Sequence, residues 1–416
     1  MTSGRAMAWN RPWEPVEPAP AVAPRTVAPG VPVEDVIGGA LASNDAGSFV
    51  VISETHPLPL GLSASWPGDP DRRALTTLSG DPELEEFELE RALFVDTETT
   101  GLAGGTGTYA FLVGCGWVEA GALRVEQYFM RDHADEPALM AHLARVISRF
   151  DWTVSFNGKS FDLPLLRTRF IMNRRRTALD ALGALDLLHV ARRLWRYQLP
   201  HRDLGTLERE ILGVERELDV PSHEIPEIYF RYLRTGDARE LVPVVAHNRV
   251  DMVSMAALLA RACDAFSDWR SPAAHPAQVL GAARSFALAG DFDAALAAYA
   301  RALELGLDEE LQPLAQAPLS LAHKRRGAWP PALDVWEVMR RRQGRGAVWA
   351  LVELAKYHEH RAGAFDSARE CTVEALAHAD RLLDALPQPL ARPALEHRLA
   401  RLDRRLLASK ARRPSG

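Results

Sequence analysis

The sequence predicts an α/β domain built on a mixed sheet, followed by an all-α domain of helical repeats. Between residues 91 and 268, short apolar strands alternate with helical segments after an initial meander, an order typical of a mixed sheet. From residue 275 to 410 the pattern is helical only, and one sequence frame recurs three times. These two observations define the expected organisation of the chain.

Composition limits the class of protein. The chain has 416 residues, 47% of them hydrophobic and 25% charged, which excludes a wholly disordered or fibrous protein. Its longest apolar runs, such as residues 109–118, are far shorter than the roughly 20 residues that cross a bilayer. No apolar core follows a basic segment at the N-terminus, and the three cysteines lie far apart, so we expect neither a secretory signal nor disulfides. We therefore expect a cytoplasmic protein with no membrane partner.

The region before the α/β domain is expected to contain little regular structure. Residues 1–33 hold seven prolines and read as a disordered tail. Residues 34–90 are expected to form a small strand-containing region, with a strand over 48–53 after a turn at 45–47. An acidic connector that ends in a short helix completes this region.

Within the α/β domain, periodicity predicts four strands and one clear helix before a mostly helical remainder that reaches residue 264. The turn at Ala120–Gly121 is short, so the strands on either side of it should be antiparallel neighbours. Another turn is expected at Asn157–Gly158. The predicted strands cover residues 93–97, 108–118, 123–130 and 153–156, and the helix covers 136–150.

The helical domain contains a repeated frame in which a glycine is followed by an aromatic residue two positions later and an alanine five positions later. The glycines are Gly290, Gly327 and Gly363, so the spacing is 37 and then 36 residues. This resembles tetratricopeptide repeats, in which stacked helix pairs bury what one pair could not. The alternative, a generic helical bundle, leaves the frame unexplained.

Acidic residues stand where strands and helices meet. Asp96 and Glu98 follow the buried segment 93–95, and residues two apart on a strand share a face. Two adjacent carboxylates repel unless a cation or proton lies between them, although such a pair also occurs by accident on exposed strands. Asp162 begins a helix after a later strand. His247 and Asp251 are four residues apart and share one helical face, where a metal is one candidate partner for the acid.

Three segments, DTETTGL, FNGKSFDLPLL and HNRVD, resemble those of DEDD-type 3′–5′ exonucleases of the ribonuclease-H-like superfamily, and are most similar to its YprB-like branch. The resemblance covers residues 91–265 and includes all four acids in order. That branch joins a ribonuclease-H-like α/β domain to tetratricopeptide-type repeats, in agreement with the predicted organisation.

The resemblance implies a site with two Mg²⁺ or Mn²⁺ ions. Asp96 would bridge both ions, Glu98 and Asp251 would complete one, and Asp162 would assist the other. Such hard cations prefer carboxylate oxygens and can bind both the attacking water and the leaving 3′ oxygen. The substrate would be held by Thr99, Gly101, Leu102, Asn157 and Lys159.

The general base departs from the family's patterns. The histidine form of the family places its base five residues before the last acid, which is Ala246 here, whereas the tyrosine form uses the position of His247. An imidazole near the ions can orient or deprotonate water. We therefore expect a catalytic role for His247, against the alternative of an ordinary histidine on a helix surface.

A basic window follows the second segment. Residues 159–202 hold ten basic and three acidic residues, although the whole chain carries a net charge of −6. Charge alone favours a solvated helical face, but the window's place directly after the second segment favours binding of a phosphate backbone. Asp186, within this window, is expected to cap or pair with the following helix rather than to act in catalysis.

The expected function is therefore a metal-dependent 3′–5′ exonuclease, with DNA favoured as substrate, in repair or nucleic-acid processing. The repeats would dock a protein partner such as a helicase or repair factor. One alternative is an adaptor that binds nucleic acid through the same domain without cutting it. Another is a metal-dependent phosphatase that acts on small nucleotides.

Overall fold

The computed structural model describes residues 31–59, 62, 66, 68–101, 106–216, 220–382 and 386–411, and these divide into two compact units. One unit ends at Ser271 and the other begins at Pro272. Most of the proline-rich segment expected to be disordered, and Leu102, lie outside the described residues. Among the helices of the described residues, none is both long and apolar enough to cross a membrane.

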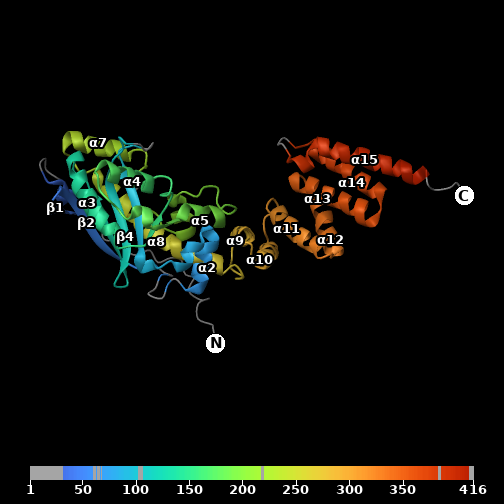
Figure 1. The fold of residues 1–416 in the computed structure, drawn as a ribbon, viewed down its shortest axis with the longest axis horizontal. Coiled ribbons are helices and arrows are strands. Elements are labelled where there is room, and N and C mark those ends of the chain that lie inside the picture. The colour runs from blue at the N-terminus through green and yellow to red at the C-terminus, as the bar shows by residue number, and fades with distance from the viewer. Residues whose placement is uncertain are drawn as a thin grey trace, which may run out of the picture. The chain divides into compact units, whose positions relative to one another are not determined.

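A seven-stranded mixed sheet organises the first unit (Figure 1), in the order β1-β2-β5-β4-β3-β6-β7. The first five strands in this order pair antiparallel, whereas β6 and β7 join β3 as a parallel edge. The class predicted from the alternation of strands and helices is confirmed. The strands are β1 Ala40–Asn44, β2 Gly47–Pro57, β3 Ala92–Thr99, β4 Ala110–Glu119, β5 Ala122–Phe129, β6 Trp152–Ser155 and β7 Gly183–Asp186.

The segment before residue 90 contributes more structure than the sequence indicated. The helix α1 (Val33–Ile37) precedes β1, and β2 pairs with β5, so these strands extend the same sheet. The connector ends in two short 3₁₀ helices, η1 (Pro82–Glu86) and η2 (Leu89–Arg91), where a short helix was predicted, whereas the longer helix α2 (Asp69–Ser79) in its first half was not predicted. Because α2 packs against two helices much later in the sequence, its formation depends on long-range contacts that local patterns do not reveal.

Two helices cover opposite faces of the sheet. On β5, the amide of Gln127 donates to the backbone carbonyl of Val245 on α8 (Leu241–Ser267) at 2.9 Å. The neighbouring residue, Tyr128, packs its ring against His142 on α3 (Glu136–Ile147), with 4.9 Å between ring centroids. Successive strand residues point to opposite faces, so α8 and α3 enclose the sheet between them. The helix predicted over residues 136–150 is confirmed as α3, and the helix predicted to carry His247 and Asp251 is confirmed as α8.

The sequence did not predict β7, because residues up to 264 were expected to be mostly helical. This strand is only four residues long, and its place depends on parallel pairing with β6. A Cβ at Gly183 would overlap the ring of Trp152 on the neighbouring strand, so glycine is required for this close approach. The smaller helices and turns that complete the unit are η3 His133–Asp135, α4 Asp162–Met172, η4 Leu179–Ala181, α5 Leu187–Leu194, α6 Leu204–Leu207, η5 Glu208–Leu212 and α7 Ile225–Thr235.

The second unit is all α-helical, as the sequence predicted. Each of the recurring glycines lies between two packed helices and has a positive φ, 82° at Gly290, 72° at Gly327 and 63° at Gly363. The alanines five positions later are buried where the second helix of each pair meets the first. The helices are α9 Pro276–Leu288, α10 Phe292–Glu304, α11 Gln312–Arg325, α12 Trp329–Arg340, α13 Arg345–Tyr357, α14 Phe365–Ala379 and α15 Arg392–Ala411, with turns η6 His358–Ala362 and η7 Gln388–Leu390.

Candidate metal and nucleotide site

A cavity of about 260 Å³ opens where β3 ends, beside the starts of α4 and α7 and the first half of α8. It brings together residues from segments up to 155 positions apart. The cavity contains all five side chains that the sequence suggested for catalysis: Asp96, Glu98, Asp162, His247 and Asp251.

The end of β3 supplies two of the acids. Glu98 is buried, and burial together with the charges of Asp251 and Asp162 raises the pKa of Glu98 to about 8. Burial is also the main cause that raises the pKa of Asp96 well above its usual range, followed by the charges of the other three acids. The strand pairing with β4 is irregular between Glu98 and Thr99, where the alternation of side chains is interrupted.

Asp162 reaches the cavity from the first position of α4. The hydroxyl of Thr97 donates to Asp162 Oδ1 at 2.5 Å and so fixes the carboxyl against β3. Burial raises the pKa of Asp162 to about 6, although this hydrogen bond opposes the shift. Behind the acid, a Cβ at Gly158 would lie 2.5 Å from the Cβ of Ser155, so only glycine permits this turn.

Asn248 on α8 ties the helix to the first acid. Its amide nitrogen donates to Asp96 Oδ2 at 2.8 Å, and its own Oδ1 accepts a 2.8 Å hydrogen bond from Gln127. A Cβ at Gly114 on β4 would overlap the Asn248 side chain. Glycine at this strand position therefore allows Asn248 to reach across the sheet and hold Asp96.

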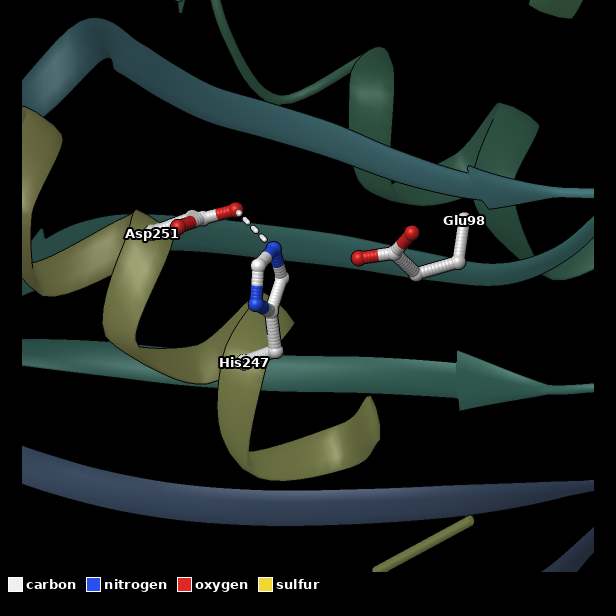
Figure 2. Close-up of side chains that lie close together, drawn as sticks. All are labelled: Glu98, His247 and Asp251. Atoms are coloured by element: carbon white, nitrogen blue, oxygen red, sulfur yellow. Dashed lines mark ion pairs between the residues drawn. The ribbon is translucent and has the colours of Figure 1, made fainter. Parts of the chain in front are cut away.

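One turn of α8 presents His247 and Asp251 toward Glu98 (Figure 2). His247 Nε2 lies 3.6 Å from Asp251 Oδ2, and ligand atoms of the three residues all lie within 4.8 Å of one another. Burial is the main cause that raises the pKa of Asp251, against the opposing effect of a neighbouring arginine. This group of two carboxylates and an imidazole is arranged as a set of metal ligands would be.

The arginine is Arg216, which the sequence analysis did not single out. Its guanidinium forms a salt bridge with Asp251 and donates to both oxygens of the buried Glu208, at 2.6 and 2.8 Å. It also lies 2.9 Å from His247 Nδ1. A guanidinium has donors only, so Arg216 is the donor and the imidazole the acceptor in this contact.

The composition of the cavity fits a divalent cation. Asp96, Glu98, Asp162 and Asp251 are four carboxyl groups whose pKa values all rise, chiefly because burial disfavours their charged forms, and repulsion from other acids of the cavity adds to the rise at Asp96 and Glu98. A cation bound among them would remove that repulsion, and hard divalent ions select carboxylate oxygen.

The residues suggested for substrate binding do not all lie together. The cavity is lined by Thr99, Gly101 and Asn157, whereas Lys159 is exposed and is not among the lining residues. Asn157 has a positive φ of 65°, and its backbone N–H donates to Asp186 Oδ1 at 2.8 Å. Asp186 also accepts from the N–H of Leu188 at 3.0 Å, which confirms its predicted role as a helix cap.

Sequence reasoning missed several residues of the site. Thr97, Asn248 and Arg216 contact acids directly, and the wall also includes Ile225 and Pro226 of α7 and Ser222 from the turn before it. Thr97 and Asn248 stand inside two of the diagnostic segments, so their proximity to acids was a usable signal. Arg216 and Glu208 lie outside those segments, and only the folded chain brings them next to Asp251.

The fold and this cavity define a member of the RNase H superfamily. The family model with that description matches residues 93–263. Along 324 residues the chain is 33% identical to the "Uncharacterized protein YprB" of Bacillus subtilis (strain 168), over 77% of this chain and 76% of that protein. The chain therefore belongs to the same family as YprB, and its residues 93–263 form a domain of the RNase H superfamily.

A solved structure with partial similarity is that of the family B DNA polymerase from the hyperthermophilic archaeon Pyrobaculum calidifontis. The match has 14% sequence identity and a TM-score of 0.34, and it covers 50% of this chain but only 29% of the polymerase. Similarity at this level supports no argument about activity.

Proposed function

We propose that the protein is a metal-dependent 3′–5′ exonuclease that hydrolyses phosphodiester bonds of nucleic acid, with DNA favoured. The observation that supports this function is the convergence of Asp96, Glu98, Asp162 and Asp251 in one cavity. Carboxylates crowded in this way are costly for the fold unless they serve a cation. The exposed arginines beyond the cavity favour a polymeric substrate over a small nucleotide.

In this proposal the four acids would hold two Mg²⁺ or Mn²⁺ ions. When bound, the ions would stabilise negative charge on the phosphate oxygens. The chain itself provides positioning: Thr97 holds Asp162, Asn248 holds Asp96, and Arg216 holds Asp251. The apolar wall of the cavity would receive the terminal nucleoside; its residues are Phe161, Leu165, Ile225 and Pro226.

His247 would accept the proton of the attacking water. The imidazole is the proposed base because it lines the cavity and its Nε2 lies 3.6 Å from Asp251 Oδ2, beside the acids that would hold the ions. A His247→Ala variant should lose turnover by about 100-fold or more. If this variant retained full turnover with an intact fold, His247 would be only a structural residue or a metal ligand that can be replaced.

The test of the function is a nuclease assay on 5′-labelled single- and double-stranded DNA and RNA, with Mg²⁺ or Mn²⁺. Wild type should shorten the strand stepwise from its 3′ end, and Asp96→Asn should abolish this. Asp180→Asn is the matched control, because Asp180 is an exposed acid that pairs with Arg167 outside the cavity. A mononucleotide diester, tested in parallel, distinguishes an exonuclease from a small-nucleotide phosphatase.

The helical unit supports a second part of the proposal. Three packed helix pairs with a glycine at each turn fit tetratricopeptide-type repeats, which would dock a helicase or repair factor. Full-length protein that binds oligonucleotides without cutting them under all conditions would instead identify the adaptor.

A further inference from the structure

We propose that the solvent face of α4 and the arginine turn after it form a second binding surface for single-stranded nucleic acid. This surface, hereafter the α4 surface, rests on the proposed function because it would hold the strand whose 3′ end enters the cavity. Asp162 at the start of α4 belongs to the site, whereas the far end of the helix lies outside the cavity. The helix α4 therefore connects the cavity with the α4 surface.

The α4 surface begins at the mouth of the cavity. Phe161, which precedes α4, lines the cavity and is still 56% exposed. From it, residues outside the core recur at steps of three or four along the helix, which places them in one stripe. The stripe consists of Phe161, Pro164, Thr168 and Ile171, and the arginine turn follows where α4 ends. A strand that leaves the cavity beside Phe161 would follow this stripe toward the arginine turn.

The length of the stripe sets the number of nucleotides that it covers. Eleven helical residues with a rise of 1.5 Å each span roughly 16 Å. Along the axis of a stacked strand each nucleotide rises about 3.4 Å. The arginine turn would therefore meet the backbone about five nucleotides from the reacting bond.

The turn itself presents three consecutive cations. Arg174, Arg175 and Arg176 are all exposed, and within the described part of the chain none of their side chains has an ion pair or hydrogen bond. Arg174 adopts a positive φ of 51°, and backbone N–H groups of Arg174 and Arg175 donate to carbonyls at the end of α4. The backbone thus fixes the turn and leaves the guanidinium groups available.

Other arginines of the same basic window are already engaged. Arg167 pairs with Asp180 at 2.5 Å, and the buried Arg169 pairs with Glu136 at 2.5 Å. Arg193 donates to two backbone carbonyls, those of Thr77 and Leu78. The structure therefore distinguishes these arginines, which hold the fold, from the cluster Arg174–Arg176, whose charge no described residue neutralises.

Apolar side chains beside the arginines favour a single strand. Ile171 is 74% exposed and Met172 is 54% exposed. Exposure of neighbouring large apolar side chains to water is unfavourable and often marks a binding surface. Unpaired bases offer flat apolar faces that pack on such side chains, while arginines bind the phosphates. The outside of a duplex offers phosphates but no base faces, so the surface suits a single strand better.

The test compares binding of fluorescein-labelled dT3 and dT12 by anisotropy, with Ca²⁺ in place of Mg²⁺. The triple variant R174Q/R175Q/R176Q should bind dT12 about 10-fold or more weakly at low salt, with dT3 unchanged. Loss of three phosphate contacts should also reduce the slope of log affinity against log salt by about 2. The lysine triple variant, R174K/R175K/R176K, should restore most of that slope.

The control is R325Q/R341Q/R404Q, which removes the same charge from exposed arginines of the helical unit. It should leave the binding of dT12 and the salt slope unchanged. Wild-type slope in the R174Q/R175Q/R176Q variant, or equal losses for dT3 and dT12, would overturn the α4 surface while the exonuclease proposal stands. Failure of wild type to bind either oligonucleotide would overturn the α4 surface, and the same failure together with no cleavage in the nuclease assay would overturn both proposals.

Discussion

The side-chain amide of Asn248 holds Asp96 through a 2.8 Å hydrogen bond across 152 positions of sequence. Gln127 on β5 in turn donates to Asn248 at 2.8 Å. A strand, a helix and a second strand thus position the first acid together. Since Asp251 lies on the next turn of the same helix, displacement of α8 would move two of the four acids at once.

Removal of this support should weaken the site without removing an acid. Asn248→Ala leaves the buried Gln127 amide with one partner fewer, so we expect about 1–3 kcal/mol lower stability toward urea unfolding. We also expect about 10- to 100-fold weaker Mn²⁺ binding by calorimetry. Ser320→Ala is a suitable control, because it breaks a buried 2.9 Å hydrogen bond with Trp336 in the helical unit. Its Mn²⁺ affinity should equal that of wild type.

Gly158 should tolerate no side chain. A Cβ there would lie 2.5 Å from the Ser155 Cβ and 3.3 Å from Asp162 Oδ2, so Gly158→Ala must displace the backbone that positions this acid. We expect a loss of turnover of about 10-fold or more with a lower melting temperature. Gly107→Ala is the matched control, since a Cβ at Gly107 meets nothing within 4 Å. Equal turnover in the two variants would show that the turn is not tightly constrained.

The metal-free protein should lose stability as the pH rises from about 4.5 to 8. Glu98 has a pKa of about 8 in the fold, against an ordinary value of 4.5, so the native state binds more protons than the unfolded chain in this window. Stability is therefore highest below the ordinary pKa and decreases until the native group ionises. The total effect is several kcal/mol, because each unit of pKa difference contributes about 1.4 kcal/mol.

Urea unfolding in the presence of a chelator, measured at intervals of pH, tests this dependence. Glu98→Gln should flatten the curve, and Mn²⁺ should stabilise wild type more at pH 8 than at pH 5 because it binds the ionised acids. Stability that rises over this interval in wild type but not in Glu98→Gln would contradict the proposed state of the cluster.

In the metal-free protein, the positive charge of Arg216 should balance the negative charges of Glu208 and Asp251. Arg216→Gln leaves Glu208 and Asp251 without their cation, so we expect a loss of about 3–5 kcal/mol in the presence of chelator. Mn²⁺ should recover part of this loss, because it supplies positive charge to Asp251. Arg231→Gln removes an exposed pair with Glu240 and should cost less than about 1 kcal/mol. Equal losses in both variants would mean that Arg216 makes no special contribution.

Local patterns were sufficient for most elements of the fold. Apolar runs and turn residues predicted β3 to β6, and the turn at Ala120–Gly121 has positive φ at both positions, 50° and 78°. β7 could not be predicted, because its four residues owe their conformation to pairing with β6 and to Trp152 packed over Gly183. The helix α2 was missed for a similar reason, since it packs on α5 and α8, which lie far along the chain.

For the site, the sequence indicated which acids to consider but not how they are held. The spacing of Asp96 and Glu98, and of His247 and Asp251, predicted side chains on common faces, and all four line one cavity. The Thr97, Asn248 and Arg216 contacts join segments that are far apart in sequence. Periodicity within one element carries no information about such contacts, so only the folded chain reveals them.

Mn²⁺ binding by titration calorimetry, with wild type beside Asp96→Asn and Asp251→Asn, tests the metal centre most directly. Asp151→Asn serves as control, because Asp151 is an exposed acid paired with Arg91. We predict saturable binding by wild type and by Asp151→Asn, with affinity reduced at least 10-fold in both cavity variants. Binding that is absent from wild type, or equally strong in all four proteins, would contradict the assignment of these carboxylates as a metal site.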